Sequence, residues 1–275
     1  MRTTSSGFVA VLLWTVALHS TAAAVEAELQ MHRAVYELSL VRSQAVSDVA
    51  GIEGRMVVEW RGGRECGGYT SMQRVVTQVT GEEDRAVSND IRLSTWEAAD
   101  GGEFRFERTE YVNGQLVENE SGIARRAGPK GAVTVEREGV PPIEMPAEVL
   151  FPVAYNLQLM AAAKAGRQLF SAPIFDGTEE AENPTNAFIG KDLEVPDDAV
   201  SAAVSGSAVP LLSEMTARPV RLSYFDRDAR EGLPNFEMGY VLLSNGVSAS
   251  LVLDYDDVVM NGRLSEVHYF AAGSC

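Results

Sequence analysis

The residues with the clearest chemical meaning are the two cysteines, Cys66 and Cys275, of which the second ends the chain. A thiol can act as a nucleophile, bind a metal or form a disulfide, and the redox compartment decides between these fates. The chain begins with the features of a secretory signal peptide, which directs a protein to an oxidising compartment. We therefore predict a Cys66–Cys275 disulfide that ties the tail to the N-terminal third of the fold.

Histidine, the usual general base, is scarce in this sequence. After the signal peptide only His32 and His268 remain. A Cys–His nucleophile made of His268 and Cys275 is the alternative to the disulfide, and oxidation of the thiol would exclude it. The sequence lacks a nucleophile elbow, a zinc-binding helix, a P-loop and a dinucleotide-binding glycine motif. We therefore expect both histidines to be ordinary strand residues.

Two groups of acidic residues have the chemistry for a site. Asp254 and Asp256, with Asp257 beside them, are spaced to project from one face of a strand, and paired carboxylates can hydrolyse glycosidic bonds. The second group could supply oxygen ligands for calcium and consists of Asp176, Glu179, Glu180, Glu182 and Asn183. It lacks the turn glycine and the bidentate glutamate of a calcium loop. Solvated surface is the commoner role of such residues, so we expect no catalytic residue, metal or cofactor.

Strands are the main elements available to position these residues. Alternating apolar and polar runs cover residues 32–40, 55–60, 69–80, 90–98 and 102–112, and an antiparallel meander is predicted over 219–272. Hairpin turns are predicted at Asn113-Gly114, Asn245-Gly246 and Asn261-Gly262, with a looser turn at Asp100-Gly101-Gly102. The fold class is therefore mainly β.

One main α-helix is predicted near residues 146–165. Proline at its start and Gly166 after its end are typical of helix boundaries, and apolar residues from Val149 to Met160 recur at helical spacing. Pro152 lies inside this segment, so the regular helix could begin nearer Val153. Segments 127–146 and 176–210 have the composition of surface loops.

Residues 1–24 have the three parts of a signal peptide: Arg2, an apolar run over 8–18, and alanines 22–24, with an alternative cut after Ala27. The apolar run is shorter than the roughly 20 residues of a membrane-spanning helix, and we expect no transmembrane segment. Residues 25–275 are interpreted as a single domain. The net charge of −16 argues against nucleic acid and anionic lipid headgroups as partners.

The chain resembles the cell envelope integrity EipB family of the Gram-negative periplasm. The matching stretches are HRAVYELSL (32–40), the run from Gly54 to Trp60, CGGYTSMQRVVTQV (66–79), LFPVAYNLQLMAAAKAG (150–166), the run from Pro173, FIGKDLEV (188–195) and the final meander. The resemblance implies an antiparallel β-spiral, which is a curved, barrel-like sheet, with a single disulfide. It also implies a periplasmic location, a role in envelope integrity and a helical-repeat protein as partner, and it carries no catalytic residues.

These observations favour a non-enzymatic periplasmic protein that supports envelope integrity through binding or scaffolding. The first alternative is a carrier or chaperone that holds a lipid or a lipoprotein segment inside the spiral. The second is a hydrolase of an envelope polymer that uses acidic residues such as Asp254 and Asp256.

Overall fold

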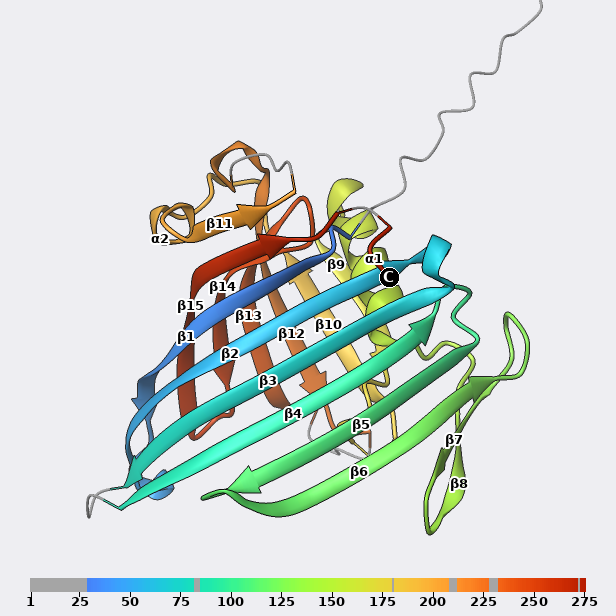
Figure 1. Cartoon of the computed structure of the whole chain (residues 1–275), viewed down its shortest axis with the longest axis horizontal. Helices are drawn as coiled ribbons and strands as arrows, with labels where there is room; N and C mark the ends of the chain where they lie inside the picture. The colour runs from blue at the N-terminus through green and yellow to red at the C-terminus, as the bar shows by residue number, and fades with distance from the viewer. Residues whose placement is uncertain (1–28, 82–84, 180, 208–211, 228–231, 272) are drawn as a thin grey trace, which may run out of the picture.

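The computed structural model describes residues 29–81, 85–179, 181–207, 212–227, 232–271 and 273–275. Its strands form one open, curved sheet, in the order β8-β7-β6-β5-β4-β3-β2-β1-β15-β14-β13-β12-β10-β9 (Figure 1). All neighbours along this path are antiparallel, and β11 adds to β15 in parallel off the path. The predicted mainly β, barrel-like fold is confirmed.

The N-terminal half of the sheet runs from β1 to β8. Its strands are β1 (His32–Ser43), β2 (Val49–Gly63), β3 (Gly68–Gly81), β4 (Ala86–Ala98), β5 (Glu103–Val112), β6 (Gln115–Arg126), β7 (Val133–Arg137) and β8 (Val140–Met145). Two short 3-10 helices, η1 (Ala45–Ser47) and η2 (Arg64–Cys66), lie in the connections on either side of β2.

The C-terminal half begins after the main helix, α1 (Pro152–Lys164). Its elements are β9 (Leu169–Ile174), β10 (Asn183–Ile189), α2 (Asp197–Val200), β11 (Ala203–Gly206), η3 (Leu212–Glu214), β12 (Ala217–Phe225), β13 (Pro234–Leu243), β14 (Ser248–Asp254) and β15 (Val258–Tyr269). No helix in the described ranges is long and apolar enough to cross a membrane.

The helix α1 lies on the inner side of the curved sheet, behind the strands β1 to β4 in Figure 1. Its buried residues Tyr155, Leu159 and Met160 belong to one large apolar cluster with inner-face residues of both halves, such as Leu38 and Leu251. A second buried cluster contains four phenylalanine side chains, Phe104, Phe106, Phe151 and Phe175, with ring centroids 5.0 to 6.0 Å apart. The inner space beside α1 is thus a packed hydrophobic core.

The helix itself is confirmed, but its predicted start near Pro146 is too early, and the alternative start nearer Val153 agrees with the structure. It starts at Pro152, with Phe151 as an extended N-cap residue. Proline suits the first helical position because its missing N–H has no intrahelical acceptor there. The preceding residues instead form a turn at Ala147 and Glu148, and Leu150 then forms a bridge with Ile174 of β9.

Both predicted loops contain regular structure. Segment 127–146 holds β7 and β8, and segment 176–210 holds β10, α2 and β11. These strands are only four to seven residues long. Their proline and acidic residues resemble loop composition, and pairing with neighbouring strands overrides that local signal.

Three of the four predicted turns lie between strands. Asn113 and Gly114 connect β5 to β6 with φ of 51° and 78°, as a type I′ turn requires. The prediction for Asn261-Gly262 is wrong, because both residues lie inside β15. A Cβ at Gly262 would come 3.0 Å from Leu251 and 3.3 Å from Leu38, so glycine lets three strands pack closely. The β14–β15 turn instead includes Asp256, with φ of 70°.

A buried carboxylate fixes the start of α1 against the sheet. Glu97 of β4 is only 3% exposed and accepts hydrogen bonds from the backbone N–H groups of Val153 (2.7 Å) and Ala154 (3.0 Å). Arg126 of β6 donates to the carbonyl oxygens of Ala147 and Val149, both at 2.6 Å. Burial raises the pKa of Glu97 to about 7, although the two N–H bonds and Arg126 act in the opposite direction.

We predict that Glu97 makes folding stability fall as pH rises from about 4.5 to about 7. The folded protein holds the proton above the ordinary pKa of 4.5 while the unfolded chain has released it. Between pH 5 and pH 8 this group should lower the free energy of unfolding by about 2 kcal/mol. Urea unfolding of wild type and Glu97→Gln at both pH values measures the effect, because the amide cannot titrate.

The exposed Glu53 of β2 offers a matched control. The variant Glu53→Gln should keep the wild-type pH dependence, whereas Glu97→Gln should lose the Glu97 contribution. An unchanged pH slope in Glu97→Gln would contradict this role of the buried carboxylate.

Candidate functional site

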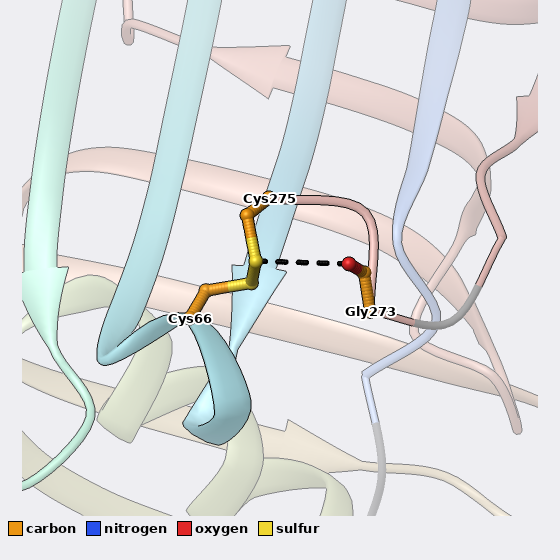
Figure 2. Close-up of a disulfide and its surroundings, with 3 residues drawn as sticks. All are labelled: Cys66, Gly273 and Cys275. Atoms are coloured by element: carbon orange, nitrogen blue, oxygen red, sulfur yellow. Dashed lines mark hydrogen bonds between the residues drawn. A yellow bond between two sulfur atoms is a disulfide. The ribbon is translucent and has the colours of Figure 1, made fainter.

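The two cysteines are joined in the structure, at one end of the spiral (Figure 2). Cys66 ends the short helix η2 between β2 and β3, and Cys275 lies in the tail that follows β15. Their Cα atoms are 5.6 Å apart although 209 positions separate them in the sequence. A sulfur in a disulfide cannot act as a nucleophile, so the oxidised protein has no Cys–His pair.

Two further contacts hold the tail against the same end of the sheet. The N–H of Gly62 in β2 donates to the carbonyl oxygen of Ser274 at 3.3 Å. The guanidinium of Arg61 lies 3.7 Å from the ring centroid of Phe270, which follows β15. These two contacts also join β2 to the tail, so the disulfide reinforces an arrangement that other interactions favour.

The two histidines have different surroundings. His32 is buried, its Nδ1 lies 2.7 Å from the carbonyl oxygen of Gln30, and burial lowers its pKa. His268 lies on the outer face of β15, and its Nδ1 shares a 3.0 Å hydrogen bond with the hydroxyl of Ser205 in β11. His32 is thus a core residue, whereas His268 belongs to an exposed polar group.

The predicted pair of carboxylates does not form on a strand face. Asp254 ends β14, and Asp256 lies in the turn that follows. The Asp254 Oδ1 accepts the N–H of Asp256 at 3.0 Å and lies 3.9 Å from Arg42. The carbonyl oxygen of Asp257 accepts the N–H of Gln44 at 2.8 Å. These aspartates shape a turn, and their arrangement gives no support to a pair of catalytic carboxylates.

The described acidic residues after β9 likewise do not converge on one site, because each contacts a different neighbour. Asp176 accepts hydrogen bonds from the N–H (3.0 Å) and the hydroxyl (2.6 Å) of Thr178. The buried Glu182 lies 3.5 Å from Arg227. Asn183 is the first residue of β10. The carbonyl oxygen of Glu179 accepts a hydrogen bond from Arg137 at 2.6 Å. Glu180 lies outside the described residues. Within the part of the chain that the structure describes, no three acidic, histidine or cysteine residues form a potential metal site.

A groove of about 640 Å³ crosses strands β1 to β5, and no sequence pattern indicated it. Strand register places most of its lining on the face turned away from α1, because neighbouring positions such as Met56 and Val58 point into the core. The lining consists of Arg33, Val57, Glu59, Met72, Gln73, Arg74, Arg92, Leu93, Ser94, Glu107, Thr109 and Tyr111. We call this hollow the outer groove.

Arg33, Arg74 and Arg92 line the outer groove, although the chain as a whole carries a net charge of −16. Arg74 and Arg92 both donate to Asp90, at 2.9 and 2.6 Å, and these bonds hold the pKa of that carboxyl well below its usual range. The Arg92 guanidinium also lies 4.9 Å from the ring centroid of Tyr111. The groove thus combines fixed cations with an aromatic ring and the half-exposed Met72.

Comparison with known proteins gives a consistent result. The family model described as EipB-like matches residues 23–271. The chain is 31% identical to the cell envelope integrity protein EipB of Brucella abortus (strain 2308) over 266 residues, which cover 96% of this chain and 92% of that protein. It also superimposes, with a TM-score of 0.81 and 30% identity, on the crystal structure of a β-barrel-like protein of a domain of unknown function from Brucella abortus, covering 89% of this chain and all of the other.

We predict that loss of the disulfide lowers stability without removing the fold. In the chain-entropy model, a closed loop of this length restricts the unfolded chain by roughly 5 kcal/mol, and measured values are typically about 2–4 kcal/mol. Thermal and urea unfolding of Cys66→Ser, Cys275→Ser and the double variant should therefore show similar losses in all three. Far-ultraviolet circular dichroism should remain close to that of wild type.

Reductant provides the control for this prediction. It should destabilise the wild type and leave the double variant unchanged, because the variant has no bond to reduce. Two titratable thiols in the native oxidised protein would show that the bond is absent in solution.

Proposed function

The chain belongs to the EipB-like family, and we propose that it is a periplasmic, non-enzymatic protein that supports cell-envelope integrity by binding through its outer groove. The name of the Brucella relative supports the role in envelope integrity, since the two chains align over almost their full lengths. The observation that carries the binding mechanism is the outer groove, whose volume of about 640 Å³ is in the range of ligand sites.

The packed interior favours binding on the outside of the spiral. Side chains of α1 and of both halves of the sheet fill the inner space in one apolar cluster. A lipid or lipoprotein segment held there would have to displace core residues such as Leu159 and Leu264, and creating such a cavity costs several kcal/mol. The outer groove needs no such rearrangement, so a ligand of either kind fits the fold best at that surface.

A protein partner, such as the helical-repeat protein that the family resemblance implies, could use the same surface. The groove has an exposed Met72, an aromatic Tyr111 and arginines at Arg74 and Arg92. Methionine, aromatic residues and arginine are enriched in protein interfaces. A binding role therefore covers small ligands and proteins, and the proposal needs no catalytic residue.

We predict that a charge in the floor of the outer groove abolishes function without unfolding the protein. Met72 is 48% exposed, so Met72→Glu introduces a carboxylate that an apolar or anionic ligand group would meet. The variant should fail to restore detergent resistance to a strain that lacks this gene. The measurement is plating efficiency with detergent, together with the amount of protein in the periplasm.

Val252→Glu is the matched control, because Val252 of β14 is 43% exposed and lies outside the groove. This variant should restore resistance as wild type does. Equal restoration by both variants, at equal protein levels, would refute a role for the outer groove.

We predict that the exported protein is cut after Ala24, so that it begins at Val25, or after Ala27, so that it begins at Glu28. Residues 1–28 lie outside the described part of the chain, and this prediction depends on the sequence alone. N-terminal sequencing of protein from the periplasm tests it. Mature protein that still begins at Met1 would contradict both the signal peptide and the periplasmic location.

A further inference from the structure

A small pocket of about 60 Å³ lies beside the outer groove, where β1, β15 and β11 run next to one another. Strand register arranges its side chains as a grid of two rows. Arg33, His268 and Ser205 form one row, and Val35, Glu266 and Ala203 form the next. Figure 1 shows the three strands side by side in the upper part of the view.

The first row offers several hydrogen-bond donors to a ligand. Ser205 Oγ and His268 Nδ1 are 3.0 Å apart, and either tautomer of the histidine leaves one polar hydrogen of the pair free. Arg33 makes no ion pair within the described residues, so its guanidinium can turn to a ligand. A guanidinium, a hydroxyl and an imidazole around one hollow suit the oxygens of a phosphate group.

The second row supplies the opposite charge. Glu266 lies on the same face of β15 as His268, two positions earlier, and its neighbours across the strands are Val35 and Ala203. Since neither neighbour carries a charge, the Glu266 carboxylate is available to an ammonium group. A ligand that is purely anionic would be repelled by this carboxylate as well as by the net charge of −16.

Two features hold β11 in the position that completes the pocket. A Cβ at Gly206, where φ is 102°, would come 2.1 Å from the carbonyl oxygen of Tyr269, so only glycine lets β11 approach β15 this closely. Ala199 of α2, which precedes β11, is completely buried. The site is therefore built on paired strands rather than on a free loop.

We propose that this pocket binds a zwitterionic phosphoamine headgroup, with the phosphate at Arg33, His268 and Ser205 and the ammonium at Glu266. The inference deepens the proposed function by naming a ligand class for the same face of the sheet. A volume of about 60 Å³ exceeds the roughly 10–15 Å³ that one water needs, so several phosphate oxygens fit.

Arg33 connects this pocket to the outer groove, because it lines both. A chain attached to the phosphate can therefore continue from Arg33 across β2 and β3, past Val57 and Met72. These two side chains supply the apolar contacts of that path, which also passes Glu59, the residue opposite both Arg33 and Met72, whose carboxylate pairs with Arg61. A single-chain phospholipid should bind more tightly than its headgroup alone, because only the lipid reaches these apolar contacts.

Calorimetric titration and the imidazole NMR signals of His268 test the proposal on the full mature protein. The probes are O-phosphoethanolamine, lysophosphatidylethanolamine and lysophosphatidylglycerol, each lipid below its micelle concentration. We expect saturable binding of the two phosphoamines, and at least tenfold weaker binding of lysophosphatidylglycerol, whose headgroup lacks the ammonium.

The variants separate the two rows of the pocket. Arg33→Gln should weaken binding of both phosphoamines at least tenfold. Glu266→Gln should weaken the phosphoamines severalfold and strengthen lysophosphatidylglycerol, because it removes a negative charge. Arg55→Gln is the matched control, since Arg55 is exposed on the outer face of β2, pairs with Glu37 and lies outside both hollows. It should bind as wild type does.

Equal affinity for O-phosphoethanolamine and lysophosphatidylethanolamine would support the headgroup site and indicate a water-soluble natural ligand. Tighter binding of the lysolipid would support the site and indicate a lipid as the natural ligand. Absence of saturable binding, or binding unaffected by Arg33→Gln, would overturn the proposal. These measurements use purified protein, whereas the proposed function is tested by Met72→Glu in cells. A failure of one is therefore distinguishable from a failure of the other.

Discussion

The pairing of β1 with β15 is the contact on which the rest of the structure depends. Other antiparallel pairs join strands close in the chain, whereas β1 and β15 bring His32 opposite Tyr269. Bringing two strands so far apart in the chain together costs conformational entropy, which the contacts between them must offset. The pairing turns two separate meanders into one sheet, and it creates the inner space that α1 fills. The Cys66–Cys275 bond stabilises the same junction, since it fastens the tail after β15 to the turn after β2.

The sheet remains open, and the way its edges are protected explains why the outer face is free for binding. At one edge, β8 contains Pro141 and Pro142, which cannot donate hydrogen bonds to an added strand. At the other, β9 is bridged by Leu150 and contacted by α1. Since the edges are blocked and the inner face is core, recognition is left to the outer face of the sheet, which carries both the outer groove and the small pocket.

The sequence predicted what depends on local pattern and missed what depends on distant strands. Alternation revealed the long strands, and Asn113-Gly114 revealed a true type I′ turn, because positive φ is a local requirement. Gly262 has the same dipeptide context, but its role is to allow contact with Leu38 and Leu251, which no local pattern shows. The outer groove takes residues from five strands and the small pocket from three. Their lining could not be identified before the register was known.

The position of Arg33 follows from this architecture. It lies on β1, the strand where the two halves meet, so β2 and the groove are on one side and β15 and β11 on the other. A side chain on a strand paired on both sides has a fixed backbone, which makes its placement more precise than on a loop. Among the described residues Arg33 forms no ion pair, because Glu59, which lies opposite it on β2, pairs with Arg61 instead. The location of Arg33 between the two hollows therefore favours a role in recognition over one in folding.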